Sequence, residues 1–276
     1  MVIDFHSHSF IPDAVAARAI GAMARNVEGV IAPIGDGTLG NQLDQMEHDG
    51  VDMAVMLPIA TKPTQHAVIL RNALAIREGR CDARSAEMLV PFMSVHPFDP
   101  ELKKHIEEIS SLGFHGVKVH PYYQNFSLED PAVRPMFEIL SANGLVVVSH
   151  CGYDVGYPGR YDACGPKEIA SLLKSVPDLV FVAAHLGGCL GFAPHATDEI
   201  VDLGCYADTS ALMRDWMRDE EMRLCQSWPA ERLLFGTDFP WNVCSEAIGW
   251  VKSVRSERDW DAVFSGNARR LLKIGN

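Results

Sequence analysis

Two histidines near the N-terminus and an aspartate near the C-terminus are the residues whose types and spacing most clearly indicate chemistry. His6 and His8 are one residue apart, and Asp238 lies in the run 233–241 (LLFGTDFPW). Residues i and i+2 of a strand point to the same side, so both imidazoles can face one ion. Zinc suits such ligands best, and manganese, iron and cobalt also accept them. A metal site built from both ends of a closed fold indicates an enzyme.

Other polar residues stand at or near the ends of short apolar runs. Lys118 and His120 lie at one run, His150 ends the next, and His185 ends the one after it. Unpaired polar side chains in a core are unfavourable, which favours one shared site over several unrelated core histidines. A metal ion with an open coordination position lowers the pKa of bound water and polarises a carbonyl group. Asp238 can bind the ion or accept the proton of that water, and His185 is the natural acid or base beside it.

The apolar runs that position these residues recur eight times along the chain. They are short, rich in β-branched residues and continuous rather than alternating, which is typical of strands buried on both faces. We therefore predict an α/β fold, a (β/α)8 TIM-like barrel forming a single domain over residues 1–276, with a doubly wound open sheet as the alternative. The predicted strands are Val2–Phe5, Met53–Leu57, Leu89–Val95, Gly116–Val119, Leu145–Ser149, Leu179–Ala184, Cys205–Ser210 and Leu233–Thr237.

The segments between these runs carry helix signals, such as a proline in the first turn or a glycine just after the last residue. Two connections, residues 9–52 and 151–166, are longer than the others, and in a barrel they follow strands 1 and 5 at the face where active sites are built. Arg160, in the second of them, can bind a carboxylate through two parallel hydrogen bonds. The predicted helices are Asp13–Arg25, Asn41–Asp49, Pro100–Leu112, Asp130–Ala142 and Pro166–Lys174.

Composition restricts the partners of the protein. A formal net charge of -12 argues against nucleic acid or an anionic membrane, since both favour basic surfaces, and leaves a small-molecule substrate. The seven cysteines are scattered and include no C-x-x-C pair, which predicts a reducing, cytoplasmic setting rather than a disulfide framework. No apolar stretch approaches the roughly 18 residues that span a bilayer. Barrels of this kind often pair, which is compatible with a homodimer, although no exposed apolar helix face stands out.

Taken together, the motifs resemble those of the amidohydrolase superfamily, specifically the amidohydrolase-related branch that includes aminocarboxymuconate semialdehyde decarboxylase. The resemblance implies a TIM-like barrel with one divalent metal ion, held at the positions of His6, His8, His150 and Asp238. It also implies that His185 is a catalytic residue beside the metal-bound water. The matching motifs are 3–8 (IDFHSH), 116–121 (GVKVHP), 147–152 (VVSHCG), 182–188 (VAAHLGG), 236–240 (GTDFP) and 266–272 (GNARRLL).

Lys118 is the position at which members of this superfamily diverge. In some two-metal amidohydrolases a carboxylated lysine bridges two ions, and Lys118 lies near that position. Its setting, Lys-Val-His-Pro, resembles instead the branch in which this lysine stays free. A free ammonium group there can bind a substrate carboxylate, and His120 can donate or relay a proton, unless it simply bonds to the backbone.

These observations predict a metal-dependent hydrolase. The enzyme would bind one divalent ion, with zinc as the first choice. The ion would activate water held by Asp238 and His185, and this water would cleave an amide, ester or lactone of a small carboxylate-bearing substrate. Lys118, His120 and Arg160 would bind the substrate. The alternative is a metal-dependent, non-oxidative decarboxylase of an aromatic or unsaturated acid. A non-catalytic binding protein that retains the site is a third hypothesis.

Overall fold

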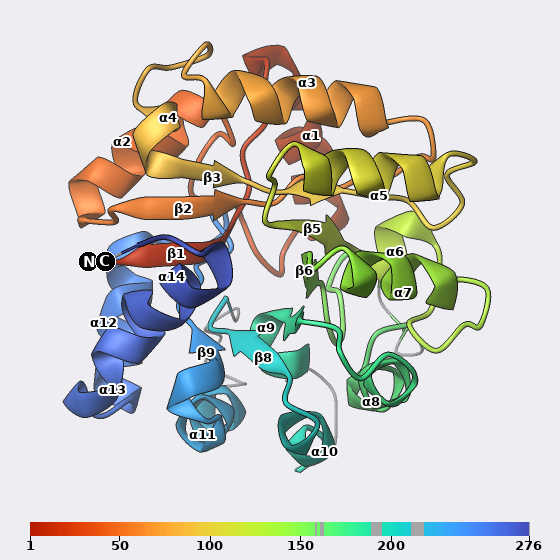
Figure 1. Cartoon of the computed structure of the whole chain (residues 1–276). Helices are drawn as coiled ribbons and strands as arrows, with labels where there is room; N and C mark the ends of the chain where they lie inside the picture. The colour runs from red at the N-terminus through yellow and green to blue at the C-terminus, as the bar shows by residue number, and fades with distance from the viewer. Residues whose placement is uncertain (158, 161–162, 189–194, 211–217, 276) are drawn as a thin grey trace.

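The computed structural model describes the chain except for residues 158, 161–162, 189–194, 211–217 and 276. A central ring of parallel strands is surrounded by helices (Figure 1). Three strands form one hydrogen-bonded run and six form a second, in chain order. The strands are β1 (Ile3–Ser7), β2 (Met53–Met56), β3 (Leu89–Pro91), β4 (Met93–Ser94), β5 (Gly116–Val119), β6 (Val146–Ser149), β7 (Phe181–Ala183), β8 (Tyr206–Asp208) and β9 (Leu233–Leu234).

The two runs meet at one end through a backbone hydrogen bond and at the other through the continuous chain between β3 and β4. The Phe5 N–H donates to the Phe235 carbonyl at 2.7 Å, so the last strand pairs with the first. The predicted strand Leu89–Val95 is divided at Phe92, where the chain stops pairing with β2 and starts pairing with β5. The Phe92 ring takes the space beside Gly116, where an added Cβ would lie 2.5 Å from it. The predicted (β/α)8 barrel is confirmed, with one of its eight strands in two pieces.

Each of the five predicted helices is present, with its ends shifted by a few residues. Thr38 begins α2 by accepting a hydrogen bond from the Asn41 N–H, and Gly50 ends it in a left-handed conformation. None of the helices formed by the described residues is long and apolar enough to cross a membrane. The helices are α1 (Asp13–Asn26), α2 (Leu39–Asp49), α3 (His66–Arg77), α4 (Ser85–Met88), α5 (Leu102–Ser111), α6 (Pro121–Gln124), α7 (Arg134–Ala142), α8 (Pro166–Ser175), α9 (Ala184–Gly188), α10 (Asp198–Asp202), α11 (Arg218–Ser227), η1 (Ala230–Arg232), α12 (Cys244–Val254), α13 (Glu257–Asp261), η2 (Ala262–Gly266) and α14 (Asn267–Leu272).

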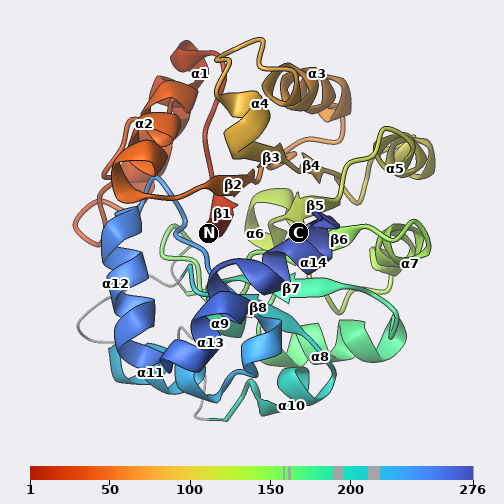
Figure 2. The same ribbon diagram turned by 60° about the vertical axis from the view of Figure 1, so that its left-hand side comes forward.

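Alternate residues of the strands serve two apolar cores. Val147 packs with the residues between strands and helices, whereas Val146 and Val148 belong to a cluster inside the barrel. Leu272 of α14 joins this inner cluster and helps to fill the end of the barrel at which both termini lie (Figure 2). The opposite end, where the strands finish, is left for polar side chains.

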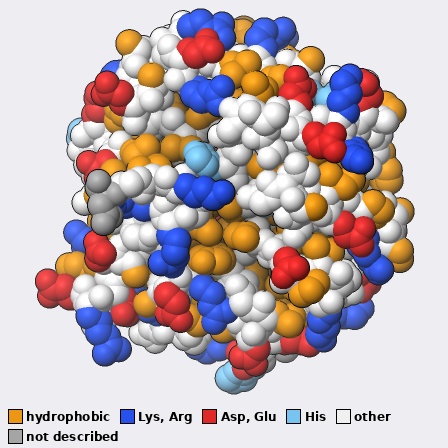
Figure 3. All heavy atoms as spheres, in the orientation of Figure 1, with side chains coloured by type: hydrophobic (Ala, Val, Ile, Leu, Met, Phe, Trp, Pro, Cys, Tyr) orange, Lys and Arg blue, Asp and Glu red, His pale blue; other side chains and the backbone are white. Residues whose placement is uncertain are grey.

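The face of the molecule seen in Figure 3 shows charged side chains of both signs among apolar ones. Six of the seven cysteines are free thiols, and only Cys81 among these six is exposed. Cys189 lies outside the described residues. Disulfide bonds therefore do not hold the described part of the chain together.

Candidate metal centre

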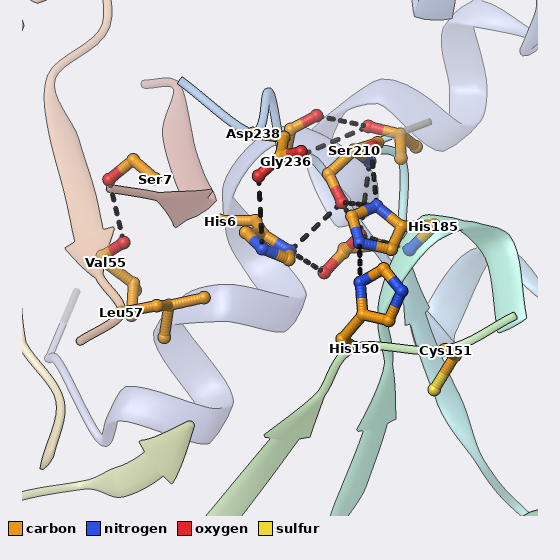
Figure 4. Close-up of polar contacts among 12 residues, drawn as sticks. His6, Ser7, Val55, Leu57, His150, Cys151, His185, Ser210, Gly236 and Asp238 are labelled. Carbon is orange, nitrogen blue, oxygen red and sulfur yellow. Dashed lines mark hydrogen bonds and ion pairs between the residues drawn. The ribbon is translucent and has the colours of Figure 1, made fainter. Parts of the chain in front are cut away.

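Side chains from both ends of the chain meet where β1 and β9 finish. The Nε2 atoms of His6 and His8 are 3.2 Å apart, and Asp238 Oδ1 lies 3.5 Å from the first and 3.2 Å from the second. A tetrahedral ion with bonds of about 2.1 Å holds its ligand atoms roughly 3.4 Å apart. The three atoms thus have the spacing of ligands to one ion, and Figure 4 shows His6 and Asp238 facing each other.

The far nitrogen of each imidazole fixes where its proton lies. His6 Nδ1 is 2.8 Å from Asp208 Oδ2, and His8 Nδ1 is 2.7 Å from the Leu57 carbonyl. Both partners only accept, so each Nδ1 carries the proton and each Nε2 keeps a lone pair. Burial, together with the nearby Lys118 ammonium, lowers the pKa of His6 to about 3, which keeps the ring neutral. Three acceptor atoms therefore converge, which is the chemistry of a cation site.

Asp238 reaches this position through an unusual backbone conformation. Its φ angle is 60°, in the left-handed region that few residues other than glycine adopt. The Asp238 N–H donates to the His6 carbonyl at 2.8 Å, and the Asp238 carbonyl accepts from the Trp241 N–H at 2.9 Å. Backbone contacts between the first and last strands thus hold the carboxylate beside the imidazoles.

A chain of hydrogen bonds runs from the Ser210 carbonyl through the His185 ring to the His150 ring (Figure 4). His185 Nδ1 lies 2.8 Å from the Ser210 carbonyl and must donate, so its Nε2 accepts from His150 Nδ1 at 3.0 Å. His150 Nε2 consequently keeps its lone pair. It is buried and has no hydrogen-bond partner among the described residues. Such a lone pair is unfavourable until a ligand uses it, so His150 has the character of a further metal ligand.

His120, His150 and Asp154 place donor atoms within 4.8 Å of one another, but their arrangement does not suit a second ion. The rings of His120 and His150 are stacked 4.1 Å apart with planes 11° from parallel. Lone pairs lie in the ring planes, so those of stacked rings run parallel and do not converge. His120 Nδ1 accepts from the Tyr123 N–H and caps α6, and its Nε2 faces Asp154 Oδ2 at 3.4 Å.

Lys118 extends into the same centre although only 1% of it is exposed. Its Nζ atom is 3.0 Å from His6 Nε2, and burial lowers its pKa. An ion at His6 would take the lone pair that Lys118 contacts, and the ammonium would then need another acceptor. This geometry suits an anionic substrate group beside the ion.

The remaining substrate-binding residue predicted from the sequence is not brought to the centre. The guanidinium of Arg160 lies 5.3 Å above the Tyr122 ring, and Arg160 is not among the described residues that line the cavity. Tyr122 turns its hydroxyl towards the Gly152 and Arg160 carbonyls instead. The sequence of the loop did not indicate this position of Arg160 beside Tyr122.

A cavity of about 100 Å³ opens above the polar centre. Both long connections contribute to its walls, as expected for the residues after strands 1 and 5. The first supplies mainly apolar side chains and the second supplies the segment 153–156. Wall residues that the sequence analysis did not identify include Phe10, Met23, Asn26, Val27, Ile31, Ile59, Asp154, Val155, Gly156 and Pro240.

Asp208 and Ser210 also escaped the sequence analysis, although the strand that bears them was predicted. Asp208 is fully buried and contacts the ring of His6 and the backbone of His185. The available signal was the same as for His6 and His8, namely two polar residues at i and i+2 where an apolar run ends.

Solved structures with the same fold cover nearly the whole chain. An uncharacterised TIM-barrel protein from Bordetella bronchiseptica matches 99% of this chain and 98% of its own, with 18% identity and a TM-score of 0.74. A probable 2-pyrone-4,6-dicarboxylic acid hydrolase from Acinetobacter baumannii with bound citric acid matches 99% of each chain, with 13% identity and a TM-score of 0.66.

The 5-carboxyvanillate decarboxylase of Novosphingobium aromaticivorans, complexed with manganese and 4-hydroxy-3-methoxy-5-nitrobenzoic acid, matches 99% of this chain and 96% of its own. Its identity is 14% and its TM-score 0.68. No curated protein matches the chain. The sequence profile of the amidohydrolase family, in contrast, matches residues 3–274. Since this match spans almost the entire sequence, the chain is an enzyme of the amidohydrolase family.

Proposed function

We propose that the protein is a metal-dependent hydrolase of a small, carboxylate-bearing substrate. The observation that carries the proposal is the convergence of two imidazole lone pairs and the Asp238 carboxylate within 3.5 Å of one another. His6, His8 and Asp238 would hold one divalent ion, and the unpartnered His150 Nε2 would complete the ligand set. When bound, zinc or a similar ion supplies an electrophile that polarises a carbonyl group and makes water more acidic.

The roles of the protein's own residues follow from their contacts. The pKa of Asp238 lies below the ordinary value of an aspartate, although burial opposes its ionisation. The carboxylate is therefore ionised at neutral pH and can accept a proton from attacking water. Lys118 would bind the substrate carboxylate, and His185, whose Nε2 lone pair faces His150 Nδ1, would serve as the acid or base beside the ion.

The cavity restricts the substrate. Its volume of about 100 Å³ limits the enclosed part of a substrate to about one small ring, because a cavity of about 150 Å³ takes up benzene. Its upper walls are largely apolar, whereas charged and imidazole groups gather at its floor. A planar or monocyclic lactone, ester or amide with one carboxylate near the scissile bond matches this distribution.

A decarboxylase is the second candidate, and a specific observation favours it. The manganese-bound neighbour is a 5-carboxyvanillate decarboxylase, and the polar floor and apolar walls of the cavity in this chain would also suit an aromatic acid. Transfer of a carboxylate from water to such a site favours loss of carbon dioxide. The buried Asp154, whose pKa is raised mainly by burial, is a carboxyl group that can return a proton to the ring.

The products distinguish the two reactions. We would load the protein with zinc or manganese and screen monocyclic lactones, esters and aromatic acids in ¹⁸O-labelled water. Incorporation of ¹⁸O into a new carboxylate group supports hydrolysis. Release of carbon dioxide with no ¹⁸O-labelled carboxylate product supports decarboxylation. An Asp238→Asn variant, which keeps the shape of the side chain, serves as the control and should lose turnover. Undiminished turnover after complete removal of metal would contradict both candidates.

A further inference from the structure

We propose that Asp208 is a positioning residue that couples a metal-binding histidine to the proposed catalytic histidine. One of its oxygens fixes the tautomer of His6, and the other fixes the backbone of His185. The consequence for metal binding rests on the proposed function, whereas the effect on the His6 tautomer does not.

The geometry divides the carboxylate between two tasks. Asp208 ends β8 between the strands that lead to His185 and Asp238, and none of it is exposed. Its Oδ2 atom accepts from His6 Nδ1 at 2.8 Å. Its Oδ1 atom accepts from the His185 N–H at 3.0 Å, from the Ser210 N–H at 3.2 Å and from the Ser210 hydroxyl. All four contacting groups are hydrogen-bond donors, so each carboxylate oxygen of Asp208 acts only as an acceptor.

The hydrogen bond between Asp208 and the His185 backbone stabilises a turn whose backbone conformation is unfavourable. His185 and Leu186 have φ angles of 58° and 53°, so two successive residues with side chains occupy the left-handed region. For residues with a side chain this conformation brings Cβ close to the following carbonyl oxygen and is less stable than the right-handed helix. The hydrogen bond from the His185 N–H to Asp208 holds the first of them. The turn directs the His185 ring towards the Ser210 carbonyl and His150.

The contact with His6 decides which ring nitrogen is available to an ion. Because Oδ2 can only accept, His6 must carry its proton on Nδ1 and keep the Nε2 lone pair. In Asp208→Asn the amide oxygen would remain with the three donors now at Oδ1, and the NH2 group would face His6 Nδ1. Although the Ser210 hydroxyl lies 3.0 Å from His6 Nδ1 and Lys118 Nζ lies 3.0 Å from His6 Nε2, the NH2 group would repel a proton on Nδ1 and favour its transfer to Nε2. That proton would point at the position of the ion and oppose metal binding.

The first test is ¹⁵N NMR of the imidazole nitrogens in the metal-free protein, with the His6 signals assigned by their loss in His6→Gln. We expect the Nδ1–H tautomer in the wild type and the Nε2–H tautomer in Asp208→Asn. Asp4→Asn is the matched control, since Asp4 is also buried and contacts the His6 backbone N–H but not the ring. It should leave the Nδ1–H tautomer unchanged. A role for Asp208 in stability alone would not predict this difference.

The second test is the affinity for Zn²⁺ alone, measured by competition with a chromogenic chelator. Loss of an outer-shell partner typically weakens metal binding by roughly 10- to 100-fold, and we expect a loss of this size in Asp208→Asn and none in Asp4→Asn. A folded Asp208→Asn with the wild-type tautomer and affinity would overturn the proposal. If that variant does not fold, an Nε2–H tautomer of His6 in the wild type would still overturn it. A wild type with the Nδ1–H tautomer but no zinc binding would contradict the proposed function and leave the tautomer role of Asp208 standing.

Discussion

Three aspartates around the end of the barrel differ in their contacts, and the contacts give them different protonation behaviour. Burial raises the pKa of Asp4 to about 7 and also raises that of Asp154. Burial opposes ionisation of Asp208 as well, but its contacts with His6 outweigh that effect and hold its pKa far below the ordinary value. The same side chain can therefore serve as a fixed anion at Asp208 and as a proton carrier at Asp154.

His8 provides the most direct test of the proposed ligand set. His8→Ala removes one of three converging donor atoms without creating a cavity in the apolar core, so we expect most bound zinc and turnover to be lost while the fold persists. Metal content by mass spectrometry and the circular dichroism spectrum check the two parts. His48→Ala is the matched control, because the His48 side chain is 82% exposed and contacts only Asp49 among the described residues. Full metal content in His8→Ala would exclude it as a ligand.

Lys118 tests how the substrate is held. Lys118→Met keeps the length of the side chain and removes the ammonium group. A hydrogen bond to a charged group contributes about 1.5–3 kcal/mol, so KM for carboxylate substrates should rise by roughly 10- to 100-fold. The KM of a matched neutral methyl ester should change little, and this comparison separates loss of the ion pair from damage to the site. Equal effects on both substrates would argue against a carboxylate-binding role.

At the scale of elements, Asp4 links the first strand to the segment after the last. Its carboxyl group accepts from the Thr237 hydroxyl at 2.5 Å, from the Thr237 N–H at 3.0 Å and from the His6 N–H at 3.0 Å. These contacts lie beside the backbone hydrogen bonds that close the barrel between Phe5 and Phe235. The titration of Asp4 should therefore be visible in the stability of the whole fold.

The sign of that pH dependence follows from the raised pKa. Burial moves the pKa of Asp4 from 3.8 to about 7, so between these values the folded protein holds a proton that the unfolded chain has lost. Its contribution to the free energy of unfolding is complete below about pH 4 and declines as pH rises towards 7. Urea denaturation of wild type and Asp4→Asn at pH 5 and pH 7.5 isolates it. From pH 5 to pH 7.5 the free energy of unfolding of the wild type should fall by on the order of 1–3 kcal/mol relative to that of the variant. An equal change in both proteins would contradict the assignment.

The sequence was most informative about elements and least informative about their connections. Eight apolar runs indicated the strands, since buried parallel strands need continuous apolar sequence, and the polar residues that end them indicated the site. The interruption at Phe92 arises from a change of pairing partner, which no local pattern records. The left-handed turn at His185 and the position of Arg160 depend on distant contacts with Asp208 and Tyr122. Contacts of this kind form only once the barrel closes.

At the scale of the whole molecule, the proposed ion would bind across the seam of the barrel. His6 lies in β1 and His8 directly follows it, whereas Asp238 follows β9, so one ion would connect the two strands whose pairing closes the ring. A ligand that binds only the folded state stabilises it according to its concentration relative to Kd, by about 2.7 kcal/mol at 100 times Kd. The stabilisation should disappear when a chelator removes the ion. It should be smaller in any variant that lacks one of the metal-binding side chains.

Thermal unfolding measures this effect without any substrate. For a protein of this size, about 2.7 kcal/mol corresponds to a rise in Tm of roughly 5–10 °C, which we expect when Zn²⁺ is added to metal-free wild type at 100 times Kd. His8→Ala should show little of the rise, whereas His48→Ala, with the proposed ligands intact, should show all of it. An equal rise in all three proteins would mean that zinc acts elsewhere on the surface. An ion held at the seam requires the rise to depend on the residues that join the two ends of the chain.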